Sequence, residues 1–152
     1  MYGIGSDMGR EETRAFLGEH GHGVLSLSRD GAGYGVPLSY GYDEGKHRCI
    51  FQLLGVNGSR KEQFLEATEA ASLTVYDYSP DDGEWRSAIA SGPIVHLSDE
   101  EVSTRAAAIF FRRAADTAAT VRESSTEGPA RGWYALEIDD VSGRVADTPV
   151  ER

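Results

Sequence analysis

The sequence has few cysteines, few lysines and no long apolar run, and each shortage excludes a class of protein. Cys49 is the single cysteine in 152 residues, so an intrachain disulfide and a cysteine-based metal cluster are both excluded. Only 15 residues are basic against 25 acidic ones, and the net charge of −10 disfavours nucleic acids and anionic membranes as partners. No stretch approaches the roughly 18 consecutive apolar residues of a membrane-spanning helix.

The N-terminal stretch MYGIGSDMGREETR also lacks the basic start and apolar centre of a secretory signal. These absences together predict a cytoplasmic protein. The composition is otherwise that of an ordinary globular chain, with 39% hydrophobic and 26% charged residues. A chain of this length is expected to form one domain. We predict a loose leader over residues 1–8, one domain over 9–146 and a short tail over 147–152.

Alternating apolar and polar residues predict most of the strands. The stretch GVLSLS (23–28) alternates with period two, Asp30-Gly31 is a strong turn signal, and YGVPLSYGY (34–42) continues as a second strand. Further strands are predicted over 47–54, 72–78, 84–97 with a bend at Gly92-Pro93, and 133–141; the tail from Gly143 has no strong pattern. Helices are predicted over 9–19, from Ser59 onward, and from Ser98 to about residue 121, the last two opening with Ser-x-x-Glu capping boxes.

The order of these elements predicts the fold class. Tight hairpins imply antiparallel pairing of the first three strands. Three helices are too few to cover a flat six-stranded sheet, whereas a small closed or half-closed barrel removes the exposed strand edges. We therefore predict a mainly β protein with flanking helices (α+β), built on a six-stranded antiparallel β-barrel.

Two adjacent cations stand at an unusual place in this acidic protein. Arg60 and Lys61 follow Ser59 in the first turn of a predicted helix, where the helix dipole disfavours each cation by about 0.3–1 kcal/mol. Ser59 and Glu62 form a capping box without any ligand, but a phosphate bound at this end would explain the cations as well. The segment is not a P-loop, because no glycine precedes Lys61. A solvated helix start and a phosphate site both stay open on these residues.

Other patterns of catalytic or metal-binding residues are weak. The histidines His20, His22, His47 and His96 lack the spacing of metal ligands on a helix, so we interpret them as surface residues and predict no metal site. No G-x-S-x-G nucleophile elbow is present. The GAGYG stretch at 31–35 lacks dinucleotide-binding spacing and is interpreted as turn glycine.

The ordered set GVLSLSRDGAGYGVPLSYGYD, CIFQLLGVNGSRKEQFLEATEAASLTVYDY and WRSAIASGPIVHLSDEE resembles the pyridoxamine 5′-phosphate oxidase-like family of flavin-binding split barrels. The resemblance covers about residues 10–140. It implies a six-stranded antiparallel split β-barrel that forms a homodimer with two FMN sites at the subunit interface. The small-molecule substrate is not identified by the resemblance.

The resemblance also implies which residues bind the cofactor. The segment that matches the family's phosphate-binding residues is Ser59, Arg60 and Lys61. The strand whose backbone lies along the flavin ring and ribityl chain is matched by Val36, Pro37, Leu38, Ser39 and Tyr40. Strand positions that contact the flavin and its phosphate are matched by Gln52 and Leu53, and a polar position near the ring by Ser87.

Departures from the family pattern narrow the expected activity. Gly35 and Tyr40 stand where the true oxidases carry cations on the second strand, and SGRVADTPVER lacks the C-terminal Arg and His that hold the vitamin phosphate. Gln52 and its neighbours replace the histidine of the nitroimidazole-reductase branch. We therefore expect an FMN-dependent oxidoreductase that acts on another small molecule, with no catalytic residue identified.

Two alternatives remain open. The same barrel could bind deazaflavin, or haem with His47 or His96 as the axial ligand. It could also be a flavin carrier or regulatory module without turnover.

Overall fold

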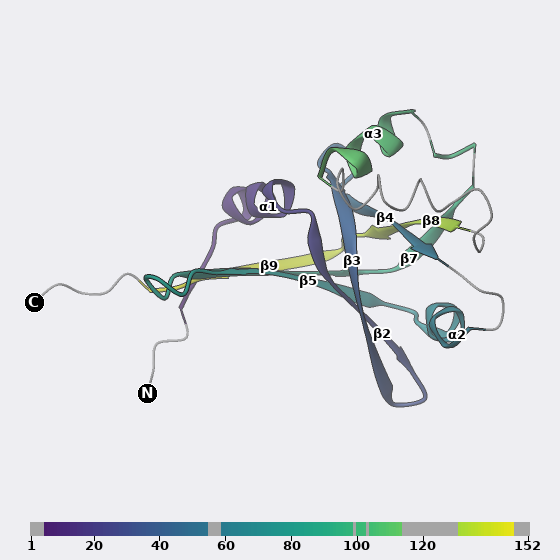
Figure 1. Cartoon of the computed structure of the whole chain (residues 1–152), viewed down its shortest axis with the longest axis horizontal. Helices are drawn as coiled ribbons and strands as arrows, with labels where there is room; N and C mark the ends of the chain where they lie inside the picture. Colours follow the sequence, from purple (N-terminus) through teal and green to yellow (C-terminus); the bar gives the residue numbers. More distant parts are fainter. Residues whose placement is uncertain (1–4, 55–58, 99, 103, 114–130, 148–152) are drawn as a thin grey trace, which may run out of the picture.

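A computed structural model of the chain describes residues 5–54, 59–98, 100–102, 104–113 and 131–147. The described residues form one antiparallel sheet in the order β1-β9-β6-β5-β2-β3-β4-β8-β7. Figure 1 shows most of its strands and the three helices around it. Its strands are β1 (Ser6–Asp7), β2 (His22–Arg29), β3 (Ala32–Asp43), β4 (Arg48–Leu54), β5 (Ala71–Tyr78), β6 (Trp85–Gly92), β7 (Ile94–Leu97), β8 (Arg131–Glu137) and β9 (Asp140–Val145). The helices are α1 (Arg10–Glu19), α2 (Arg60–Ala67) and α3 (Thr104–Arg113).

The mainly β class is confirmed, but the described residues form nine strands and not the predicted six. The stretch predicted as one bent strand over 84–97 is divided at Pro93 into β6 and β7. The stretch predicted over 133–141 is divided into β8 and β9, and β9 extends into the tail where no pattern was recognised. Ser6 and Asp7, within the predicted loose leader, pair with β9 as β1. The part of the third helix predicted beyond residue 113 lies outside the described residues.

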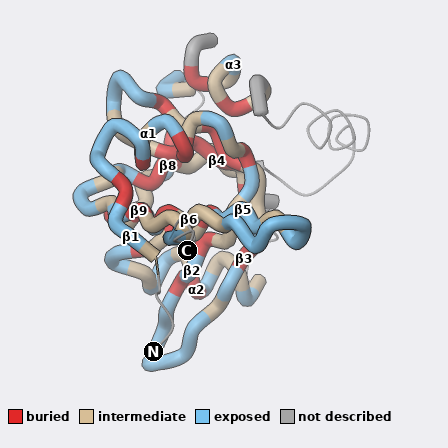
Figure 2. The backbone as a smooth tube through the Cα atoms, turned by 90° about the vertical axis from the view of Figure 1, so that its left-hand side faces the viewer, coloured by how far each residue is buried: buried red, intermediate tan, exposed pale blue. Residues whose placement is uncertain are grey.

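The sheet curls because β6 and β7, which lie near its opposite ends, follow each other directly along the chain. β6 pairs with β9 and β7 pairs with β8, while only Pro93 separates β6 from β7. At this bend the amide of Glu137 donates to the carbonyl of Pro93 at 2.9 Å. A Cβ atom on Gly92 would lie 1.8 Å from the carbonyl oxygen of Glu137, so only glycine fits there. Figure 2 shows the strands arranged around a common interior.

Side chains on the two faces of the sheet form two cores. The main core fills the interior; its largest fully buried side chains include Tyr40, Phe16, Phe51, Leu17, Leu25 and Leu73. A second cluster lies on the outer face of β4, β8 and β7 under α3, and consists of Ile50, Leu97, Ala106, Phe110 and Ala135. Gly41 permits this packing, because a Cβ there would lie 2.5 Å from the carbonyl oxygen of Ile109.

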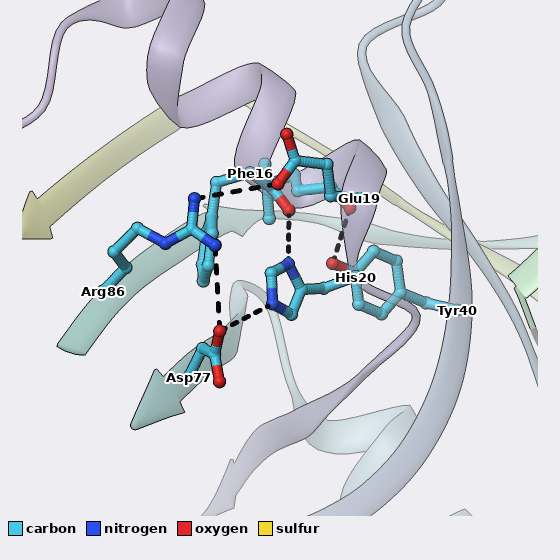
Figure 3. Close-up of polar contacts among 7 residues, drawn as sticks. Phe16, Glu19, His20, Tyr40, Asp77 and Arg86 are labelled. Carbon is cyan, nitrogen blue, oxygen red and sulfur yellow. Dashed lines mark hydrogen bonds and ion pairs between the residues drawn. The ribbon is translucent and has the colours of Figure 1, made fainter. Parts of the chain in front are cut away.

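Helix α1 is fastened to the strands by its C-terminal end (Figure 3). The Tyr40 hydroxyl donates to the carbonyl of Leu17 at 2.8 Å, and the Arg86 guanidinium lies 4.9 Å from the ring centroid of Phe16. His20 Nδ1 lies 3.0 Å from the carbonyl of Phe16, and Nε2 lies 3.6 Å from the Asp77 carboxylate. His20 is therefore half-buried and structural, where a surface position was predicted.

Local signals in the sequence are largely reproduced. Asp30 and Gly31 both have positive φ, of 51° and 80°, as a tight hairpin requires. Ser59 Oγ accepts from the amide of Glu62 at 3.1 Å and caps α2 as predicted. The box at Ser98 and Glu101 forms too, but it closes a turn ahead of α3, which begins at Thr104.

Cys49 is buried on β4, and this burial raises the pKa of its thiol to about 12. Within the described residues, no helix has the length and apolar character needed to span a membrane.

Candidate functional site

The predicted cofactor residues gather where β3 changes its neighbour in the sheet. From Ala32 to Ser39, β3 pairs with β2, and from Tyr40 to Asp43 it pairs with β4. The β3–β4 register ends at Tyr40 opposite Phe51. β2 and β4 therefore separate at this point, next to Ser39 and Gln52. The chain leaves β4 here and next enters α2, whose start carries the predicted phosphate residues.

Several predicted residues point into the main core, and their side chains cannot contact a ligand on the outside. Val36 is 7% exposed, Tyr40 is 0% exposed and Leu53 is 4% exposed. Leu38 is half-buried and packs against the same core. Period-two alternation along β3 explains this result, because residues 36, 38 and 40 share one face. For these four positions only the backbone remains available to a cofactor.

Pro37 and Ser39 lie on the opposite, outer face. Pro37 lies opposite Val24 of β2, Val24 lies opposite Thr74 of β5, and Thr74 lies opposite Ile89 of β6. Directly opposed residues of antiparallel strands share a face. These side chains therefore form one row across the outer face. Pro37 and Ile89, at its two ends, are exposed.

Ser87 is on the same outer face but at a distance from β3. It lies opposite Tyr76 of β5 and Arg144 of β9. β5 and β2 stand between β6 and β3, so Ser87 is three strand spacings, about 14 Å, from β3. Ser87 therefore does not contact Pro37 or Ser39 within the chain. The sequence interpretation did not include Val24, Thr74, Tyr76 or Ile89, although period-two alternation along 72–78 could have indicated two of them.

Gln52 is half-buried on β4 and lies opposite Trp133 of β8. Trp133 packs against Phe110 and Phe111 of α3, with ring centroids 5.3 and 6.0 Å apart. Gln52 thus lies beside the part of the outer face that α3 covers. The backbone places Gln52 next to the end of the β3–β4 pairing, close to Ser39.

The start of α2 presents cations that have no carboxylate partner among the described residues. The Arg60 guanidinium lies 5.5 Å from the ring centroid of Tyr34 and 5.7 Å from that of Phe64. Lys61 is half-buried, and within the described part of the chain neither cation has a carboxylate within 4 Å. Tyr34 and Phe64 are also in contact, with centroids 5.1 Å apart, so an aromatic pair supports Arg60.

The acidic side chains of α2 lie near β8, whereas Arg60 lies near β3. Burial raises the pKa of Tyr134 on β8, and the negative charges of Glu62 and Glu66 raise it further. The two carboxylates therefore affect β8, while Arg60 lies against Tyr34 of β3. The two sides of α2 thus differ in charge.

The histidines considered as haem ligands lie elsewhere. His47 is on the turn between β3 and β4, and its Nδ1 is 2.9 Å from the Tyr42 hydroxyl. His96 is exposed on β7 and contacts the ring of Tyr134, with centroids 5.1 Å apart. Three cavities of about 840, 360 and 670 Å³ lie outside the predicted FMN site, and none of the residues predicted to bind FMN lines them, although His47 lines the 360 Å³ cavity.

Comparison with known proteins identifies the class. A family model described as pyridoxamine 5′-phosphate oxidase matches residues 9–145. The chain therefore belongs to this family. No curated protein matches it.

Solved structures share the fold at low identity. A crystal structure of an FAD-binding protein from Mesorhizobium loti has a TM-score of 0.74 at 19% identity, covering 95% of this chain and 100% of the other. An FAD- and haem-binding protein from Mycobacterium smegmatis has a TM-score of 0.64 at 20% identity, covering 95% and 75%. An FAD-binding protein from the same organism has a TM-score of 0.61 at 15% identity, covering 93% and 98%. At these identities the likeness establishes the fold, which is consistent with the predicted split barrel.

Proposed function

We propose that the chain binds a flavin nucleotide, with its ring on the outer sheet face at Pro37 and Ser39 and its phosphate at the start of α2. The carrying observation is the pair Arg60 and Lys61, which lack carboxylate partners among the described residues and lie just after the point where β2 and β4 separate. Membership of the family supports the proposal, as do solved structures with this fold that are named as FAD-binding proteins.

The residues at the start of α2 fit a phosphate group. Ser59 Oγ accepts from the amide of Glu62, and its hydroxyl hydrogen remains free to donate to a phosphate oxygen. The Arg60 guanidinium lies over the rings of Tyr34 and Phe64, and its N–H donors have no carboxylate partner among the described residues. The amides of the first helical turn have no acceptor within the helix, which favours an anion there.

The outer sheet face fits a flat ring that a second subunit covers. Three large hydrophobic side chains are exposed in the described part of the chain: Tyr76 at 68%, Tyr78 at 59% and Ile89 at 44%. Tyr76 and Ile89 lie on the same face as Pro37 and Ser87. Exposed apolar area of this kind marks an interaction surface. We infer a homodimer in which the partner's copy of this face completes each flavin site.

The bound flavin would supply hydride or electron transfer, and the chain would bind and orient it and exclude water. We propose an oxidoreductase that acts on a small molecule, with FMN as the cofactor because the cationic segment accounts for a single phosphate group. No side chain is assigned as a catalytic acid or base. The buried hydroxyl of Tyr40 is bonded to Leu17 and does not face the proposed site.

The phosphate assignment is tested by changing both cations at once. The variant Arg60→Ala/Lys61→Ala loses two charge-assisted interactions of about 1.5–3 kcal/mol each. FMN binding, followed by fluorescence titration, should weaken at least 100-fold. Riboflavin lacks the phosphate, so its affinity should be the same in the variant and the parent. The matched control Arg10→Ala/Lys46→Ala removes the same charge from exposed positions on α1 and the β3–β4 turn, away from α2, and should bind FMN like the parent. Equal FMN affinity in both double variants would exclude a phosphate at α2.

The cofactor identity and the activity need separate measurements. An absorbance spectrum of the purified protein and mass spectrometry of the heat-released ligand distinguish FMN, FAD, deazaflavin and haem. FMN release supports the proposal, whereas a Soret band or a deazaflavin mass contradicts it. Oxidation of NAD(P)H with an added electron acceptor tests turnover. Tight flavin binding with no turnover of any donor would indicate a carrier or regulatory module instead.

A further inference from the structure

One cavity, away from the proposed flavin site, is lined by both cationic and anionic side chains. It has a volume of about 360 Å³ and lies between the first turns of α1 and the link from β8 to β9. Its walls include Arg10 and Arg14 of α1, His47 of the β3–β4 turn, and Asp139 and Asp140. The volume is within the range of pockets that bind small molecules, roughly 300–1,000 Å³.

The two arginines of this cavity have no carboxylate partner among the residues that the structure describes. The described structure places no carboxylate within 4 Å of Arg10 or Arg14, although the protein carries a net charge of −10. The Nε atom of Arg14 is buried and has no hydrogen-bond partner in the described structure. By contrast, carboxylate partners are present for Arg29, Arg48, Arg86 and Arg144. A buried N–H donor without an acceptor is unfavourable, and no described carboxylate compensates the charge of Arg14.

Both arginines lie close enough to His47 to act on its ring. Burial lowers the pKa of His47, and the positive charges of Arg14 and Arg10 lower it further. The amide of Ile138, the residue before Asp139, donates to the carbonyl of His47 at 3.1 Å, so the aspartate segment also lies beside His47. Arg14 is half-buried, whereas Arg10, Asp139 and Asp140 are exposed.

Tyr42 holds the ring of His47 through a hydrogen bond. Its hydroxyl lies 2.9 Å from His47 Nδ1, and burial raises the pKa of Tyr42, so the phenol stays protonated. In the neutral tautomer that accepts from Tyr42 at Nδ1, the ring hydrogen is on Nε2, and Nε2 would be the donor to a ligand. The backbone of His47 has a φ of 50°, which is unusual for a residue other than glycine.

We propose that this cavity binds a small zwitterion of the amino-acid type. Its carboxylate accepts hydrogen bonds from Arg14, Arg10 and His47, and its ammonium group donates to Asp139 or Asp140. Two positive and two negative side chains sum to zero, so a neutral dipolar ligand matches the cavity. A ligand with only a negative charge would be repelled by the two aspartates, and a ligand with only a positive charge would be repelled by the two arginines. The site shares no residue with the proposed flavin site.

Thermal-shift and calorimetric titrations with glycine, L-alanine and L-glutamine test the proposal. At least one of these probes should bind, and acetate or methylammonium at the same concentration should not. The variants Arg14→Gln and Asp139→Asn/Asp140→Asn should each weaken binding at least tenfold. The double variant changes only exposed side chains and is expected to fold, and Glu69→Gln/Asp81→Asn is the matched control at exposed sites away from the cavity. Absence of binding, equal binding of acetate, or full affinity in the Asp139→Asn/Asp140→Asn variant would each overturn the proposal.

A second readout reports the orientation of the ligand. A carboxylate beside His47 favours the protonated ring, so the probe should move the NMR titration of His47 to higher pH. The same probe should leave the signals of His96, which is exposed on β7, unchanged. A downward shift of the His47 titration would place the ammonium group at this end and would overturn the assignment.

Discussion

The variant Tyr40→Phe removes one buried hydroxyl and should weaken the attachment of α1 to the sheet. Tyr40 is 0% exposed, and its hydroxyl donates to the carbonyl of Leu17 at 2.8 Å. Leu17 lies in the last turn of α1, where the backbone carbonyl oxygens accept no hydrogen bond from within the helix. Such a carbonyl needs a hydrogen-bond donor from elsewhere in the protein. The variant keeps the aromatic ring and its packing, so the loss is confined to the hydrogen bond.

The expected loss of stability in Tyr40→Phe can be estimated from this one hydrogen bond. A hydrogen bond of this kind contributes about 0.5–1.5 kcal/mol net, and a buried carbonyl left without a donor costs about 1–3 kcal/mol. For a domain of about 150 residues, each kcal/mol changes the Tm by about 2–4 °C. We expect the Tm of Tyr40→Phe to fall by on the order of 2–6 °C. FMN affinity should stay within about threefold of the parent, because the phenol faces the interior.

Thermal and urea unfolding of Tyr40→Phe should be compared with Tyr76→Phe. Tyr76 is 68% exposed, so its hydroxyl already contacts water and its removal should change the Tm little. Equal Tm values for the two variants would refute the role assigned to the Tyr40 hydroxyl. A large loss of FMN affinity in Tyr40→Phe, without a loss of stability, would show that the side chain contacts the cofactor after all.

Two further predictions concern the backbone and pH. Gly92→Ala places a Cβ 1.8 Å from the carbonyl oxygen of Glu137 and should destabilise the fold by about 3 kcal/mol or more, whereas Gly33→Ala has no atom within 4 Å and should be silent in the same urea unfolding assay. Stability should fall as the pH drops below about 6.5, because burial and two arginines lower the folded-state pKa of His47 and the unfolded chain binds the proton first. His47→Asn, which tolerates the positive φ, should reduce that pH dependence, and an unchanged profile would contradict this account.

Local signals allowed much of the sheet to be predicted, and long-range contacts account for what was missed. Asp30-Gly31 specified its hairpin, and Pro93 marked the bend between β6 and β7, because both effects act within a few residues. β9 carries no alternating pattern, and it forms because β6 and β1 lie on either side of it. Gly143 within it packs against Met8 and Thr13, a contact that no sequence window contains.

The candidate site was predicted at the level of segments rather than side chains. Matching a strand to a family motif does not decide which of its residues face outward. Val36 and Tyr40 entered the core and Pro37 and Ser39 did not, as period two requires. The cavity between Arg14 and Asp139 could not be predicted, since these residues are far apart in the sequence and are brought together only by the packing of α1 near the β8–β9 link.

The position of β9 has a consequence for synthesis of the protein. β9 lies between β1 and β6, and Asp7 and Arg144, paired across β1 and β9, are 137 positions apart. A nascent chain that has completed β6 at Gly92 must wait for Asp140 before that strand acquires its second neighbour. At ribosomal rates of about 5–20 residues per second, this interval is roughly 2–10 s. During it, the edge of β6 from Arg86 to Ser91 offers unpaired backbone groups to any other extended segment. Chaperones that act during translation are therefore expected to bind mainly nascent chains that have completed β6 but not yet β9.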